Sequence, residues 1–173
     1  MEDPRYPIGK FVPERDPTPE KRAAMIRDIT AMPAGLRAAV NGLTPAQLDT
    51  PYRDGGWTVR QLVHHVADSH MNSFVRFKLA LTEEKPQIKP YDQDAWVTLP
   101  DAHGDITSSL AILDGLHARW AALLLSLKGS DFSKTFLHPE NGPTTLDRAL
   151  QIYAWHGKHH TAHVTALRSR EGW

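Results

Sequence analysis

Apolar residues recur every three or four positions along four long segments of the chain, the spacing that gathers them on one face of an α-helix. The clearest segment follows Thr58, a favourable N-cap residue, and predicts a helix from there to about Leu81. Its apolar stripe consists of Val59, Leu62, Val63, Val66, Phe74, Phe77 and Leu81.

The first of the other helices is predicted to begin at Thr18-Pro19, an N-cap followed by a proline at the first helical position. It extends to about Asn41, where Gly42 can cap its end. We expect Pro33 to break or kink this helix, because proline has no backbone N–H to donate.

Two further helices are predicted over residues 107–128 and 146–169, the second capped by Thr144 or Thr145. Thr44-Pro45 predicts one short helical turn, and residues 83–104 read as a long loop because they contain three prolines and Gly104. No segment resembles a convincing pair of strands. The pattern therefore predicts an all-α fold, a four-helix bundle over residues 18–173, preceded by an extended, proline-rich arm over residues 1–17.

Composition limits which partners, metal ligands and cellular locations we expect. Twenty basic and 20 acidic residues give a formal net charge of zero, which does not favour nucleic acid as a partner. The absence of cysteine leaves His, Asp and Glu as the side chains able to hold a metal. No signal peptide or membrane span is evident, so we expect a cytoplasmic protein with no membrane partner.

Histidines concentrate near the C-terminus, where four of the ten lie between Trp155 and His163. His156/His160 and His159/His163 are both spaced four residues apart, so either pair can bind one cation from one helix face. A third ligand can come from the helix after Thr58. Helical periodicity makes His70 and His160 the more buried pair and puts His65, His159 and His163 at the edge of the core, where an open metal position is easier to form. Periodicity alone does not settle the choice.

Longer runs of the sequence resemble the YfiT-type branch of the DinB superfamily, a group described as metal-dependent hydrolases. The resemblance covers nearly the whole chain. It rests on Tyr6-Pro7-Ile8-Gly9, on residues 48–61 with Asp54-Gly55-Gly56-Trp57, on His64-His65-Val66-Ala67-Asp68-Ser69-His70, on Leu116-His117-Ala118-Arg119-Trp120, and on the Trp155–His163 segment.

The resemblance implies a four-helix bundle, a homodimer, and one zinc ion per subunit bound by His65, His159 and His163; nickel or manganese is the alternative metal. His156, one turn before this pair, is a candidate for orienting a ligand or, in a closed structural site, for a fourth ligand. His70 and His160 are then expected to be core residues that hydrogen-bond to each other or to backbone, and His64 is expected to face solvent.

Three histidines leave a zinc position open for water or substrate, which indicates an enzyme acting on a small molecule. Activation of water gives a hydrolase. Binding of a low-molecular-weight thiol, which loses its proton on coordination, gives a thiol S-transferase of the bacillithiol type. No side chain identifies itself as a general base, and a structural zinc or a binding protein is the non-enzymatic alternative.

Overall fold

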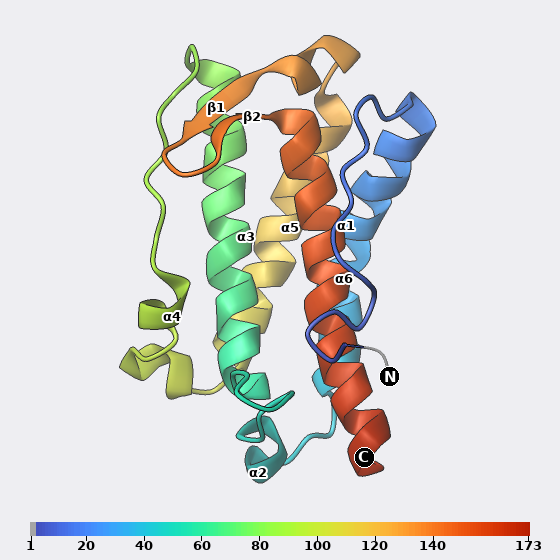
Figure 1. Ribbon diagram of the computed structural model, residues 1–173, viewed down its shortest axis with the longest axis vertical. Helices are drawn as coiled ribbons and strands as arrows, with labels where there is room; N and C mark the ends of the chain where they lie inside the picture. Colours follow the sequence, from blue (N-terminus) through green and yellow to red (C-terminus); the bar gives the residue numbers. More distant parts are fainter. Residues whose placement is uncertain (1–2) are drawn as a thin grey trace.

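The computed structural model describes residues 3–173 and contains the four predicted long helices. They are α1 (Pro19–Val40), α3 (Val59–Thr82), α5 (Thr107–Ser126) and α6 (Leu146–Glu171). In Figure 1, α1 and α6 run towards the end of the bundle that carries α2 (Pro45–Leu48), whereas α3 and α5 run the opposite way. α1 and α3 each pack against α5 and α6. The fold is therefore a four-helix bundle, as predicted.

The helices begin where their capping residues stand. The side-chain oxygens of Thr18, Thr58 and Thr145 each accept a hydrogen bond from a backbone N–H three residues later. Thr58 and Gln61 form a reciprocal capping box, which satisfies one more backbone donor at the start of α3. The observed helix boundaries thus lie within one or two residues of the predicted ones, because threonine N-caps mark the starts of three of the helices.

Pro33 lies inside α1, and of the break or kink that we expected, the break does not occur. Proline in a helix leaves the carbonyl four residues earlier without its usual partner. That carbonyl belongs to Ile29, and it accepts a hydrogen bond from Nδ1 of His117 on α5 at 2.6 Å. A side chain of a neighbouring helix therefore replaces the backbone donor that Pro33 lacks.

Two connections contain more structure than predicted. β1 (Thr135–His138) and β2 (Gly142–Thr145) form an antiparallel hairpin across one end of the bundle, which the sequence prediction missed. The segment predicted as a loop over residues 83–104 returns along the outside of α3 (Figure 1) and includes α4 (Gln93–Trp96) and the 3-10 helix η1 (Pro100–His103).

Residues 3–17 form no helix or strand, as expected of an arm, and the first two residues of the predicted arm lie outside the described part of the chain. The buried side chain of Gln151 on α6 holds the arm by two hydrogen bonds to the backbone of Glu14, with its Oε1 accepting at 2.7 Å and its Nε2 donating at 3.0 Å. Further along the arm, the Tyr6 ring lies 6.3 Å from the ring of His159. The arm therefore covers part of α6 close to its histidines.

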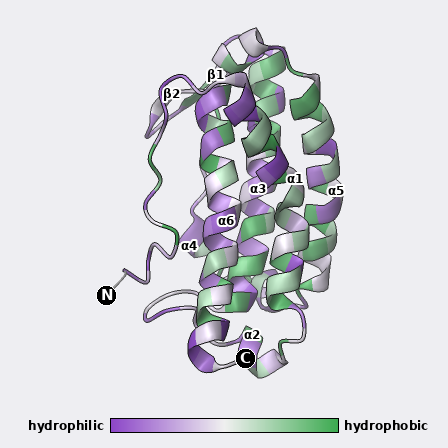
Figure 2. Ribbon diagram, turned by 90° about the vertical axis from the view of Figure 1, so that its right-hand side faces the viewer, coloured by the Kyte–Doolittle hydropathy of each residue, from purple (hydrophilic) through white to green (hydrophobic). Residues whose placement is uncertain are grey.

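Each long helix carries hydrophobic and hydrophilic residues along its length (Figure 2), and the buried apolar residues form two clusters rather than one. One cluster includes Val63, Leu113 and Val164, and the other includes Phe77, Trp120 and Leu150. On α3, α5 and α6, the sequence between the two clusters holds five of the buried histidines, which are His70, His117, His159, His160 and His163. A layer of imidazoles thus divides the core. Within residues 3–173, every helix is too short or too polar to span a lipid bilayer.

Candidate metal centre

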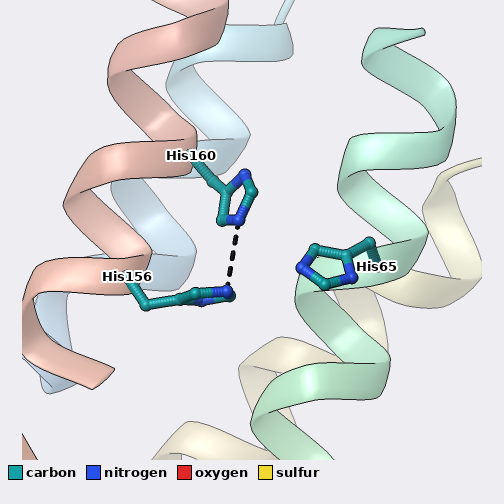
Figure 3. Close-up of side chains that lie close together, drawn as sticks. All are labelled: His65, His156 and His160. Atoms are coloured by element: carbon teal, nitrogen blue, oxygen red, sulfur yellow. Dashed lines mark hydrogen bonds between the residues drawn. The ribbon is translucent and has the colours of Figure 1, made fainter. Parts of the chain in front are cut away.

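Three histidines from two helices bring their ring nitrogens together. His65 on α3 faces His156 and His160 on α6 (Figure 3), and one nitrogen of each lies within 4.8 Å of the others. Among residues 3–173, this is the one group of three or more potential ligands at that spacing. Imidazole nitrogens suit zinc and other first-row divalent metals, so the donor set fits a cation of this class.

The spacing within α6 fits a shared ion. Nε2 of His156 lies 3.1 Å from Nε2 of His160. Two nitrogens that coordinate one tetrahedral zinc at its usual bond length lie about 3.3 Å apart. The two rings therefore stand close to the separation that a common metal requires.

Burial keeps these histidines neutral. It lowers the pKa of His65 to about 4, because a charged imidazolium would lose its hydration. The pKa values of His156 and His160 are also held well below their ordinary value, first by burial and then by the neighbouring histidines. At neutral pH the rings offer lone pairs without first losing a proton, which favours metal binding.

His159 and His163, the pair implied by the family resemblance, are not members of this group, although the ring of His159 lies 5.3 Å from that of His160. Their Nε2 atoms are 3.1 Å from each other, but the structure does not bring both of them together with His65 within the 4.8 Å limit that His156 and His160 meet. The ring of His159 stacks on Trp155 at 4.2 Å. The predicted set of His65, His159 and His163 is thus not assembled as one cluster, although the pair itself has a ligand-like spacing.

A cavity of about 450 Å³ opens onto the three-histidine cluster. His159 also lines this cavity, together with Arg53 and Asp94 as its charged groups. No salt bridge joins Arg53 to a carboxylate within residues 3–173. The cavity therefore presents a cluster of neutral nitrogens beside one cationic and one anionic side chain, which form no salt bridge with each other. The residues that line it are Tyr52, Arg53, Gly55, Gly56, Trp57, His65, Gln93, Asp94, Trp155, His156, His159 and His160.

Two of the expectations for the remaining histidines were wrong. His64 is buried rather than exposed, and its ring bonds to Ser109 Oγ at 2.7 Å and to the carbonyl oxygen of Gly104 at 3.3 Å. His70 is a hydrogen-bonded core residue as expected, but its partners are His156 and His117 rather than His160. Helical periodicity correctly predicted that His70 is buried, but it could not predict which histidine rings form its hydrogen bonds.

His117 received no role from the sequence, yet it is almost fully buried and contacts His70. A signal was present, because His117 falls on the apolar stripe of α5, four residues after Leu113 and three before Trp120. A polar residue in that position must find a buried partner. This reasoning would have placed His117 next to the other core histidines.

The comparison with protein families decides the relationship. A family model of the DinB superfamily matches residues 28–164, most of the chain and all four long helices in whole or in part. The chain belongs to the DinB superfamily. Its DinB relatives include a Bacillus cereus (strain B4264) protein whose name proposes a metal-dependent hydrolase, 56% identical over 173 residues, with both chains covered completely. A second such protein, from Bacillus thuringiensis subsp. konkukian, is 55% identical over the same length.

Two solved structures resemble the fold of this chain. YfiT from Bacillus subtilis, described as a probable metal-dependent hydrolase with an unusual four-helix bundle topology, is 51% identical and covers 98% of each chain with a TM-score of 0.95. TT2238, a four-helix bundle protein, is 20% identical with a TM-score of 0.56 and covers 88% of this chain and 99% of its own. The second likeness concerns the fold alone.

Proposed function

We propose that this protein is a metal-dependent hydrolase of a small molecule, with a zinc ion held by His65, His156 and His160. The observation that carries the proposal is the convergence of three neutral imidazoles on the wall of an open cavity. The names of the DinB relatives support the reaction class. The physiological metal is proposed as zinc, with nickel or manganese as the alternatives that imidazole ligands also accept.

The residues around the cavity have two proposed roles, to hold the ion and to bind the substrate. A zinc ion in a three-histidine site supplies Lewis-acid chemistry, which lowers the pKa of a bound water to about 7. Trp57 lies against His65 at a ring distance of 4.7 Å and limits the motion of that ligand. Arg53 lines the same cavity and can bind a negatively charged group of a substrate. The open side of the cavity leaves room for the substrate itself.

Metal affinity distinguishes the proposed ligands from the set implied by the family resemblance. We expect His156→Ala and His160→Ala each to weaken zinc binding by more than the roughly 10–100-fold typical when a partner of a ligand is removed. His159→Ala and His163→Ala should keep the affinity within about tenfold. Calorimetric titration of zinc into metal-free protein measures both outcomes.

His65→Ala and His64→Ala form the control pair for the titration. Both histidines are buried neighbours on α3, but His64 bonds to Ser109 and Gly104 instead of facing α6. His65→Ala should abolish tight binding and His64→Ala should preserve it. A loss of zinc in His159→Ala and His163→Ala, with normal affinity in His156→Ala and His160→Ala, would instead support the set implied by the resemblance.

The reaction is tested with zinc-loaded protein on panels of esters and amides. Metal-dependent cleavage that disappears in His65→Ala supports the hydrolase proposal. A parallel incubation with an electrophilic dye and a low-molecular-weight thiol tests group transfer. Conjugation of the dye to the thiol without any hydrolysis would reject the hydrolase in favour of an S-transferase. Loss of zinc from His65→Ala accompanied by unfolding would favour a structural metal.

A further inference from the structure

A chain of hydrogen bonds through the buried histidine layer ends on a proposed metal ligand. Nδ1 of His117 lies 2.6 Å from the carbonyl oxygen of Ile29, and Nε2 of His117 lies 2.9 Å from Nδ1 of His70. Nε2 of His70 then lies 3.0 Å from Nδ1 of His156. Three imidazoles from α5, α3 and α6 are thus linked in series to one backbone oxygen of α1.

The backbone oxygen gives the chain a direction. A carbonyl oxygen only accepts, so Nδ1 of His117 must carry the proton in this bond. A neutral imidazole has one donor and one acceptor, which leaves Nε2 of His117 as an acceptor and makes Nδ1 of His70 the donor. The same alternation makes Nδ1 of His156 the donor to His70 and leaves Nε2 of His156 with a lone pair.

The remaining evidence concerns charge. His70 and His117 are almost completely buried, which disfavours a charged ring, and the bonds that link the chain to α1 and α6 involve no carboxylate. Neutral rings are therefore the stable form, and only one proton arrangement satisfies every bond. Pro33 contributes as well, because it cannot donate to Ile29 and leaves that carbonyl available.

We propose that Ile29, His117 and His70 set the tautomer of His156, so that its Nε2 lone pair faces His160 and the cavity before any metal arrives. His117 and His70 are positioning residues: they act through His156 and do not touch the ion. The consequence for metal affinity rests on the proposed function, whereas the tautomer itself is a property of the metal-free protein.

The two proposed ligands on α6, His156 and His160, differ in whether a hydrogen bond fixes their tautomer. The Nδ1 atom of His160 is buried and has no hydrogen-bond partner within residues 3–173, so no chain fixes the tautomer of this ring. In the metal-free protein its Nε2–H can donate to Nε2 of His156 at 3.1 Å. Binding of zinc should therefore move the proton of His160 from Nε2 to Nδ1 and leave that of His156 in place.

Nitrogen-15 NMR of the histidine side chains tests the proposal directly, because a protonated ring nitrogen and a bare one have different chemical shifts. In metal-free wild-type protein, His156, His70 and His117 should all carry their proton on Nδ1. A proton on Nε2 of His156 would overturn the proposal, whatever the metal affinity is.

Substitution of His117 provides the second test. His117→Leu removes the donor to Ile29 and the acceptor for His70, so His156 should populate both tautomers and bind zinc about tenfold more weakly. His117→Gln offers an amide N–H to Ile29 and an amide oxygen to His70, and should restore both readouts. His64→Leu is the matched control, since it removes another buried, doubly bonded histidine that lies outside the chain.

An unchanged His156 tautomer and unchanged zinc affinity in His117→Leu, relative to His64→Leu, would overturn the proposal. If His117→Leu fails to fold, the wild-type spectrum and the His117→Gln variant still decide. Should the wild-type protein show the expected tautomers and yet bind no zinc at His156, the proposed function fails and the hydrogen-bonded chain stands.

Discussion

The four histidines of α6 occupy little more than two helical turns, and each has a different neighbour. His156 bonds to His70, His159 stacks on Trp155, and His163 lies 4.3 Å from the ring of Tyr52. His160 faces both His65 and His156. All four are the same residue on the same helix. At the scale of single residues, the differences between the rings therefore come from the neighbouring segments that they contact.

Gly157 lies among these histidines and permits a close approach of α1 to α6. A Cβ atom built there would stand 2.4 Å from Cγ of the buried Met32. We predict that Gly157→Ala lowers the free energy of unfolding by about 1 kcal/mol, because overpacking at about 1–3 kcal/mol exceeds the helical preference for alanine. Urea unfolding measures the change.

Gly35 supplies the control for this prediction. It is exposed inside α1, and a Cβ there would meet nothing within 4 Å. Gly35→Ala should therefore stabilise the protein by up to about 1 kcal/mol. Equal effects of the two substitutions would show that the contact with Met32 has no energetic importance.

At the scale of elements, Gln151 attaches the arm to α6 by hydrogen bonds. The Gln151→Ala variant removes both hydrogen bonds to the backbone of Glu14, and no other bond in residues 3–17 links the arm to α6. We predict faster hydrogen–deuterium exchange in the arm residues around Glu14, because their backbone becomes free to leave the helix surface. Exchange in α3 should stay unchanged, and protection of the arm equal to that of wild type would contradict the prediction.

The long helices were predictable because local signals mark them: all four have apolar residues at helical spacing, and α1, α3 and α6 also begin at a threonine cap. The hairpin was not, since each of its strands has only four residues and β2 contains Gly142 and Pro143. Its pairing also joins Leu137 to Pro86 and Ile88 of a distant loop, which no local pattern reveals.

The metal site was predictable in part. The sequence predicted that His65 and a histidine pair of α6 come together, but His156/His160 and His159/His163 have the same spacing and cannot be distinguished on one helix. The difference arises from the position of α3 relative to α6, which depends on packing along the whole bundle. The role of His117 in the hydrogen-bonded chain could not be predicted either, because it depends on the same packing and on the Ile29 carbonyl that Pro33 leaves without a backbone donor.

For the whole molecule, the buried histidines make stability depend on pH. Burial lowers the pKa of His65, His159 and His163 to about 4, against an ordinary value of 6.5 in the unfolded chain. Between these values the unfolded chain binds protons that the folded protein excludes, so stability falls as the pH falls. Asp68, whose pKa is raised to about 6 by burial and Asp101, opposes this trend with a single group.

We therefore predict that metal-free protein loses at least about 2 kcal/mol of unfolding free energy between pH 7.5 and pH 5. Urea titrations at the two pH values give the difference, and stability that is constant or rises on acidification would contradict it. The homodimer expected from the family resemblance stays a prediction, and both titrations should be run at one protein concentration because the stability of a dimer depends on concentration.

Pro33 has a consequence for engineering. A proline inside a helix is less favourable than alanine by about 3 kcal/mol, so a search for a heat-resistant variant would replace it early. Such a replacement would add a backbone donor to the Ile29 carbonyl and compete with His117 for it. Thermal tolerance and correct orientation of a ligand would then be opposing objectives at one position, a reason to leave Pro33 untouched when the protein is redesigned.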